Sequence, residues 1–280
     1  MTGGLIRAVH PFPSVLDAAA ATAIAVVAGA QIGVALRLGL GMLLVQFAIG
    51  AANDFADAAA DSMAKPRKPI PAGLVSRSAV AAVCVVASTA GLTVAATVSS
   101  WALVLAIVGL ADGLVYDLRL KATPLAWVPF AAGVGLLPLY AWLGSRGSVA
   151  AAFVGVVAMA VVAGAALALA NAYADLDRDR RSGVRSIAVF LGAQRTLVAN
   201  AALLAALQVV ALATTIAGGG PFEPILVEAG GCGLGWFALA LAGVRSDRVR
   251  PLVWEIQAVS LVVLGTAWLA ALQTAGVLGA

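Results

Sequence analysis

Residues 53–73 read NDFADAAADSMAKPRKPIPAG, an acidic segment that follows a long apolar run and precedes a basic, proline-rich loop. Asn53, Asp57 and Asp61 are each four residues apart. On a helix they fall within roughly 80° of arc and about 12 Å of axial length. Asp54 lies at the edge of the same face. We therefore expect one helical face that carries three carboxylates and an amide.

The same pattern occurs a second time, in residues 171–186, which read NAYADLDRDRRSGVRS. A shift of 118 residues places Asn53 on Asn171 and Asp57 on Asp175. The same shift pairs Phe55 with Tyr173, Asp61 with Asp179, Arg67 with Arg185 and Arg77 with Arg195. This indicates an internal repeat. Because the shift spans four predicted helices, an even number, we expect a parallel repeat, whereas inverted-repeat transporters use odd-numbered units.

The composition indicates a helical membrane protein. The chain is 62% hydrophobic and 11% charged, against about 45–50% and 25% in soluble domains. Apolar runs of about 18 residues or more recur throughout, and strands of alternating polarity are absent. We expect an all-α, polytopic fold, a single integral-membrane domain over residues 1–280, with repeat units at 14–117 and 124–244 and an extra helix at 252–276. The nine expected spans are 14–35, 39–60, 78–98, 101–117, 124–144, 149–174, 194–216, 226–244 and 252–276.

The basic residues separate by side when these spans are threaded through a membrane. One side holds only Arg37 and Arg146. The other side holds Arg7, Lys65, Arg67, Lys68, Arg77, Arg119, Lys121, Arg178, Arg180, Arg181, Arg185, Arg195, Arg245, Arg248 and Arg250. The positive-inside rule then predicts a cell-membrane protein whose N-terminus and acidic segments are cytoplasmic. The net charge of +4 follows from this topology, so we expect no nucleic-acid partner.

The acidic faces suit a divalent cation. Carboxylates at the C-terminal end of a helix meet the negative end of its dipole. Two of them about 5 Å apart also repel by about 3 kcal/mol at an effective dielectric near 20. Mg²⁺ prefers such oxygen ligands and is commonly shared with a substrate phosphate. The alternative is that the acids are only solvated helix ends, which we favour for Asp177.

The basic loop after the first motif suits a diphosphate. Lys65, Arg67 and Lys68 lie among three prolines, which restrict the backbone and hold the cations near the carboxylates. Arg185 would approach from the other side. The alternative is that these cations serve only as membrane-topology anchors.

The chain resembles the UbiA-type intramembrane prenyltransferase family. The family's first motif, N-D-x-x-D-x-x-x-D, fits residues 53–61, and its second fits Asp175-x-x-x-Asp179 with the Arg-Arg-Ser-Gly that follows. The segments Pro-Ile-Pro-Ala-Gly (69–73) and Tyr116-Asp-Leu-Arg-Leu-Lys121 are also similar to that family. The likeness covers nearly the whole chain.

This resemblance implies a helical bundle around a central chamber, and Mg²⁺-dependent transfer of a prenyl group from a polyprenyl diphosphate to an aromatic or lipophilic acceptor in the membrane. We expect no obligate protein partner. The metal ligands would be Asn53, Asp54, Asp57, Asp61, Asp175 and Asp179. Catalytic roles would fall to Asp57, Asp175, Arg67 and Lys68. Substrate contacts would come from Lys65, Arg67, Lys68, Tyr116, Lys121, Arg185 and Asn171. Tyr116, Phe55 or Tyr173 could offer an aromatic face to an allylic cation.

Several alternatives stay open. Some members of the family cyclise the prenyl diphosphate, and others transfer phosphoribose to a polyprenyl phosphate. A transporter with an acidic cation site is the rival from another class, although it would place its acids mid-span. We do not expect haem as the acceptor, because His10 is the only histidine and stands ahead of the first span.

Overall fold

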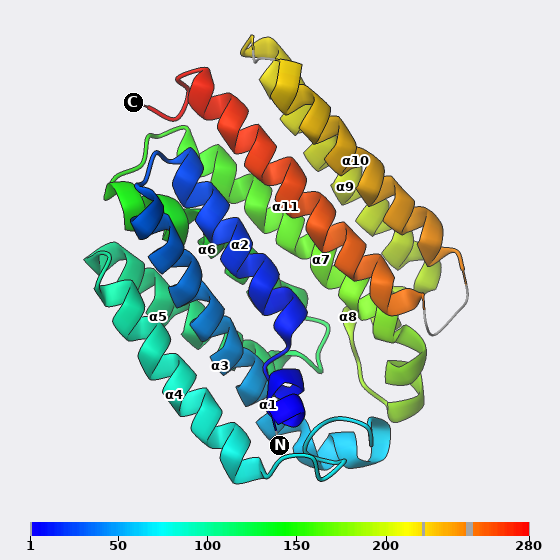
Figure 1. The fold of residues 1–280 in the computed structure, drawn as a ribbon. Helices are drawn as coiled ribbons and strands as arrows, with labels where there is room; N and C mark the ends of the chain where they lie inside the picture. Colours follow the sequence, from blue (N-terminus) through cyan, green and yellow to red (C-terminus); the bar gives the residue numbers. More distant parts are fainter. Residues whose placement is uncertain (1, 220–221, 245–248, 280) are drawn as a thin grey trace. The chain divides into compact units, whose positions relative to one another are not determined.

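A computed structural model describes residues 2–219, 222–244 and 249–279, and within these ranges helices are the only regular secondary structure, which confirms the predicted fold class (Figure 1). Eight of the described helices are long and apolar enough to cross a membrane, and α2 is a shorter apolar helix. Together they correspond to the nine predicted spans. Arg245 and Arg248, which contributed to the charge pattern, lie outside the described residues. The elements are α1 (Thr2–Ala8), α2 (Pro11–Val27), α3 (Ile32–Ala64), α4 (Arg77–Ala96), α5 (Ser100–Val115), the π-helix η1 (Tyr116–Leu120), α6 (Trp127–Arg146), α7 (Phe153–Ser182), α8 (Ile187–Leu191), α9 (Ala193–Ala217), α10 (Phe222–Ala242) and α11 (Arg250–Thr274).

The first predicted boundary, at residue 35, is wrong. Helix α2 ends at Val27 because Gly29 adopts a left-handed conformation, with φ of 84°. The Ala30 amide then donates to the Ala25 carbonyl at 3.0 Å, the bond that closes a Schellman-type helix end. Helix α3 begins at Ile32 and continues for 33 residues, about 50 Å, so the first acidic motif forms the end of one unbroken helix.

The chain forms two compact units. The first comprises Met1–Lys121 and Leu139–Gly147, and the second comprises Ala122–Pro138 and Ser148–Ala280. In the first unit, α3 packs against α2, α4 and α5 (Figure 1). In the second, α7 packs against α9 and α11, and α10 packs against α11. The single domain, the parallel repeat and the central chamber stay predictions.

Basic side chains gather at one end of the first unit. Arg37, in the first turns of α3, donates to the carbonyl of Thr97 just beyond the C-terminus of α4 at 3.2 Å. Arg77 begins α4, so it lies at the far end of that helix, the end at which α3 stops and is followed by Lys65. In the first unit, Arg37 and the cations around the acidic motif therefore lie at opposite ends of the helices, as the charge pattern predicts.

Candidate active site

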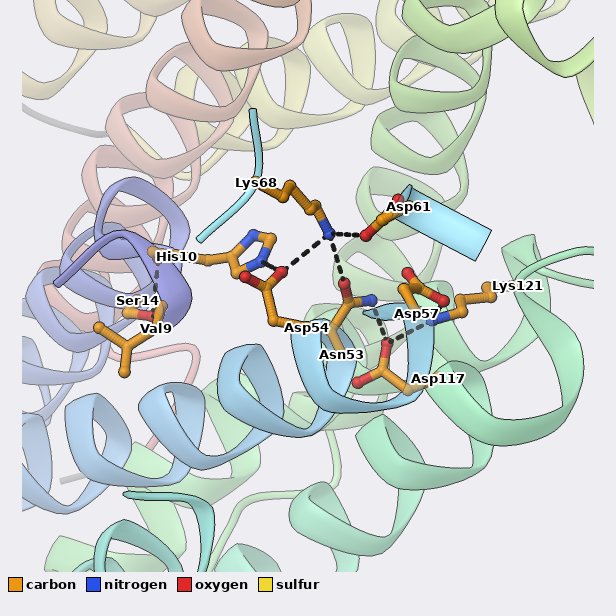
Figure 2. Close-up of polar contacts among 10 residues, drawn as sticks. All are labelled: Val9, His10, Ser14, Asn53, Asp54, Asp57, Asp61, Lys68, Asp117 and Lys121. Carbon is orange, nitrogen blue, oxygen red and sulfur yellow. Dashed lines mark hydrogen bonds and ion pairs between the residues drawn. The ribbon is translucent and has the colours of Figure 1, made fainter. Parts of the chain in front are cut away.

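Lys68 lies over the first acidic motif and contacts three of its side chains (Figure 2). Its Nζ atom is 2.8 Å from Asp54 Oδ1, 2.9 Å from Asp61 Oδ2 and 3.5 Å from Asn53 Oδ1. Burial alone would lower the pKa of Lys68, but its hydrogen bonds to Asp54 and Asp61 outweigh this and raise the pKa above its ordinary value. The ammonium group therefore stays charged at neutral pH.

The basic loop returns Lys68 to the helix through a series of tight turns. The Lys65 amide donates to the Asp61 carbonyl at 2.8 Å, and the Lys68 amide donates to the Lys65 carbonyl at 2.9 Å. A further bond joins the Ala72 amide to the Lys68 carbonyl at 2.9 Å. Since the prolines also restrict the backbone, the loop has few ways to move Lys68 away from the carboxylates.

A second cation, Lys121, neutralises the other side of the motif. Its Nζ atom lies 2.6 Å from Asp57 Oδ1 and 4.0 Å from Asp117 Oδ1. Asn53 donates to Asp117 Oδ1 at 2.6 Å (Figure 2). The π-helix η1 positions this pair, closed by a bond of 2.9 Å from the Lys121 amide to the Tyr116 carbonyl. Such wide turns occur frequently at functional sites.

Sequence reasoning missed two members of this cluster, His10 and Asp117. His10 Nε2 lies 3.0 Å from Asp54 Oδ1 (Figure 2). Asp117 is only 4% exposed, and its Oδ2 atom has no hydrogen-bond partner among the described residues. The spacing of Asp117 and Lys121, four residues apart, was a usable signal for an acid and a base on one helical face. His10 gave no such local signal.

Arg67 and Phe55 have different surroundings from those expected. The Arg67 side chain is exposed, and its carbonyl accepts a bond of 2.8 Å from Arg7 Nη2. The Arg77 guanidinium lies 4.3 Å from the centroid of the Phe55 ring. Phe55 thus already holds a cation of the protein itself, which argues against its offering that face to an allylic cation.

The second acidic motif ends α7, in the second unit. Asp175 pairs with Arg178 one turn later. Asp177 Oδ2 lies 2.5 Å from Arg250 Nη1, and the Arg250 guanidinium lies 5.9 Å from the Tyr173 ring centroid. Asp177 therefore ties α7 to the start of α11, which gives it a structural role. The remaining predicted residues of this motif are Asn171, Asp179 and Arg185, and their convergence with the first motif stays a prediction.

The first motif has the donor chemistry of a Mg²⁺ site. It offers carboxylate and amide oxygens, the ligands that Mg²⁺ prefers. No three His, Cys, Asp or Glu side chains converge as a metal cluster within the described ranges; Lys68 and Lys121 instead neutralise the acids in two groups. The buried Oδ2 atom of Asp117 has no hydrogen-bond partner among the described residues, and a bound cation would satisfy it. The residues fit the ion by donor type.

The fold and site define a class: a multi-pass helical membrane protein with a cluster of acids and ammonium groups at the end of its longest span. A model of the UbiA prenyltransferase family matches residues 14–260. The chain belongs to this family, and the predicted resemblance is confirmed.

Individual relatives are more distant. The digeranylgeranylglyceryl phosphate synthase of Thermococcus kodakarensis is 28% identical over 192 residues, 67% of this chain and 62% of the relative. The enzyme of the same name from Methanoculleus marisnigri is 29% identical over 147 residues, 51% of this chain and 52% of the relative. The matches thus span less than two thirds of these relatives' lengths.

Solved structures support the fold. An apo UbiA homologue from Aeropyrum pernix has a TM-score of 0.73 at 19% identity, covering 92% of this chain and 97% of that one. A UbiA homologue from Archaeoglobus fulgidus bound to DMAPP and Mg²⁺ has a TM-score of 0.71 at 17% identity, covering 95% and 99%.

Proposed function

We propose that this protein transfers a prenyl group from a polyprenyl diphosphate to a lipophilic or aromatic acceptor within the cell membrane, with Mg²⁺ as cofactor. The observation that carries the proposal is the first acidic motif with Lys68 and Lys121 on it: hard oxygen ligands beside rigidly held cations, in a member of this family. A UbiA homologue from Archaeoglobus fulgidus is bound to DMAPP and Mg²⁺, which supports the choice of a prenyl diphosphate and Mg²⁺ for this proposal.

The chain's own residues would divide the work as follows. The motif carboxylates Asp54, Asp57 and Asp61, with the Asn53 amide, would hold the metal, joined by Asp175 and Asp179 of the second motif. Mg²⁺, when bound, supplies Lewis acidity toward the diphosphate oxygens. Lys68, Lys121 and Arg67 would stabilise the negative charge that grows on the departing diphosphate, and such preorganised charges act most strongly in the transition state. Apolar spans would exclude water, which would otherwise capture the allylic cation as an alcohol.

The acceptor to test first is a glyceryl phosphate lipid. Two relatives are named digeranylgeranylglyceryl phosphate synthase, and a product of that name carries geranylgeranyl groups on a glyceryl phosphate. An acceptor of this kind would be amphiphilic, with a polar group at the membrane surface beside the basic loop. We assign this surface to the cytoplasmic side, because it carries the basic loop and basic loops of membrane proteins are mostly cytoplasmic.

The decisive assay supplies purified protein with Mg²⁺, a lipid extract and geranyl, farnesyl or geranylgeranyl diphosphate. We expect diphosphate release and a prenylated lipid by mass spectrometry. Removing a preorganised cation costs about 3–4 kcal/mol, or roughly 10²–10³ in rate. Lys121→Ala, which removes the ammonium group 2.6 Å from Asp57 Oδ1, should therefore slow single-turnover diphosphate release by about that factor. Arg119→Ala, which removes an exposed cation of η1, should not. If wild-type protein releases no diphosphate with any of these substrates, the proposal fails and a transporter becomes the reading to test.

A further inference from the structure

The junction between α1 and α2 is seated closely on α3. A Cβ atom at Gly50 would lie 2.7 Å from the Val9 carbonyl oxygen and 2.8 Å from its carbon, so a glycine is needed for this approach. Ser14 Oγ donates to the Val9 carbonyl at 3.0 Å and to the His10 carbonyl at 2.9 Å. The junction is thus fixed both to α3 and to the start of α2.

His10 adopts an unusual backbone conformation at this junction. Its φ of 50° and ψ of 68° are left-handed, and no other non-glycine residue within the described ranges has a positive φ. Such a conformation is unfavourable for an L residue and persists only where the surroundings impose it. Arg7 adds a tie from α1 to the basic loop through the Arg67 carbonyl. The fold therefore imposes this strain in the conformation that brings the imidazole to Asp54.

Asp54 Oδ1 receives two contacts, one from His10 Nε2 at 3.0 Å and one from Lys68 Nζ at 2.8 Å (Figure 2). An ionised carboxylate only accepts hydrogen bonds, so His10 donates its Nε2–H. Two donors on one oxygen fix the rotation of the carboxylate and leave Oδ2 as the oxygen to bind a cation. At 2% exposure, Asp54 has little solvent to replace either donor.

We propose that His10 is a positioning residue that acts through Asp54, orienting this carboxylate toward the metal and diphosphate. The inference rests on the proposed function for the identity of the ligand. Partners that orient a metal-binding group in this way typically contribute roughly 10- to 100-fold to metal affinity or activity. His10 would thus act on the cation through a carboxylate that lies 44 residues away in sequence.

The test measures Mn²⁺ binding by electron paramagnetic resonance, with inorganic diphosphate present, so that no turnover is needed. Asparagine tolerates the left-handed conformation, but its amide is too short to replace Nε2, whereas a glutamine amide nitrogen reaches about as far. We expect His10→Asn to weaken Mn²⁺ binding by roughly 10-fold or more and His10→Gln to recover most of it. Val15→Ala, at a 55% exposed position of α2, is the matched control and should bind as wild type does.

A double-mutant cycle decides whether the effect passes through Asp54. In an Asp54→Asn background, His10→Asn should cause no further loss, because the group that it orients no longer binds the cation. Wild-type Mn²⁺ affinity in His10→Asn, equal losses in the Asn and Gln variants, or an undiminished loss in the Asp54→Asn background would each overturn the inference.

The proposed function can fail separately. If wild type binds Mn²⁺ as expected and the cycle behaves as above, but no prenyl diphosphate is turned over, the positioning role stands and the transferase does not. A wild-type protein that binds no Mn²⁺ overturns both.

Discussion

Replacing Lys68 with methionine tests whether this ammonium group is what allows the first motif to fold without a metal. Asp54 and Asp61 oxygens lie 2.8 Å and 2.9 Å from Lys68 Nζ, so the two carboxylates are under about 6 Å apart and, without the cation, repel by about 3 kcal/mol at an effective dielectric near 20. The Lys68→Met variant bears this repulsion.

A destabilisation of about 3 kcal/mol lowers the Tm of a domain of this size by roughly 6–12 °C. We expect that drop for Lys68→Met in detergent with EDTA, measured by tryptophan fluorescence at one fixed scan rate. Saturating Mg²⁺ should restore most of it, because the cation replaces the missing charge between the carboxylates. Catalysis should stay low even then, since the diphosphate has lost a preorganised donor.

Arg119→Met is the matched control, because it removes one exposed positive charge from the same unit. Its Tm should change by no more than about 2 °C, because most surface substitutions change stability by less than about 0.5 kcal/mol. Equal Tm values for the two variants in EDTA, or a Lys68→Met protein whose Tm does not respond to Mg²⁺, would refute the reasoning that Lys68 holds these acids in place.

Two further predictions concern the acids and the topology. Asp57→Asn and Asp175→Asn should each abolish turnover while the protein remains inserted and folded, as judged by size-exclusion elution; near-normal activity at saturating Mg²⁺ in either variant would remove that residue from the site. Single cysteines at Ser78 and Ser182, both exposed, should resist a membrane-impermeant thiol reagent in intact cells once the two native cysteines are replaced. Labelling of both from outside would reverse the orientation.

The overall fold could be predicted because membrane insertion depends on properties that are local in sequence. A span needs about 20 apolar residues, and such runs are visible without knowledge of packing. The error at the first boundary has the same origin. Hydropathy does not register the left-handed turn at Gly29, so the apolar residues on both sides of it were assigned to one span, although α2 ends at Val27 and α3 begins at Ile32.

For the site too, the residues that share one stretch of sequence could be predicted, and those brought in from distant stretches could not. The helical spacing of the acids and the basic loop behind them can be read along a single stretch, and the structure indeed places Lys68 on Asp54 and Asp61. Asp117 meets Asn53 across 64 residues, through a π-turn that no periodicity indicates. His10 depends on still more: a glycine in α3 that admits the junction and a strained backbone that the junction imposes. Motifs thus reveal the residues that bear charge, while the residues that aim them emerge only when distant helices are packed together.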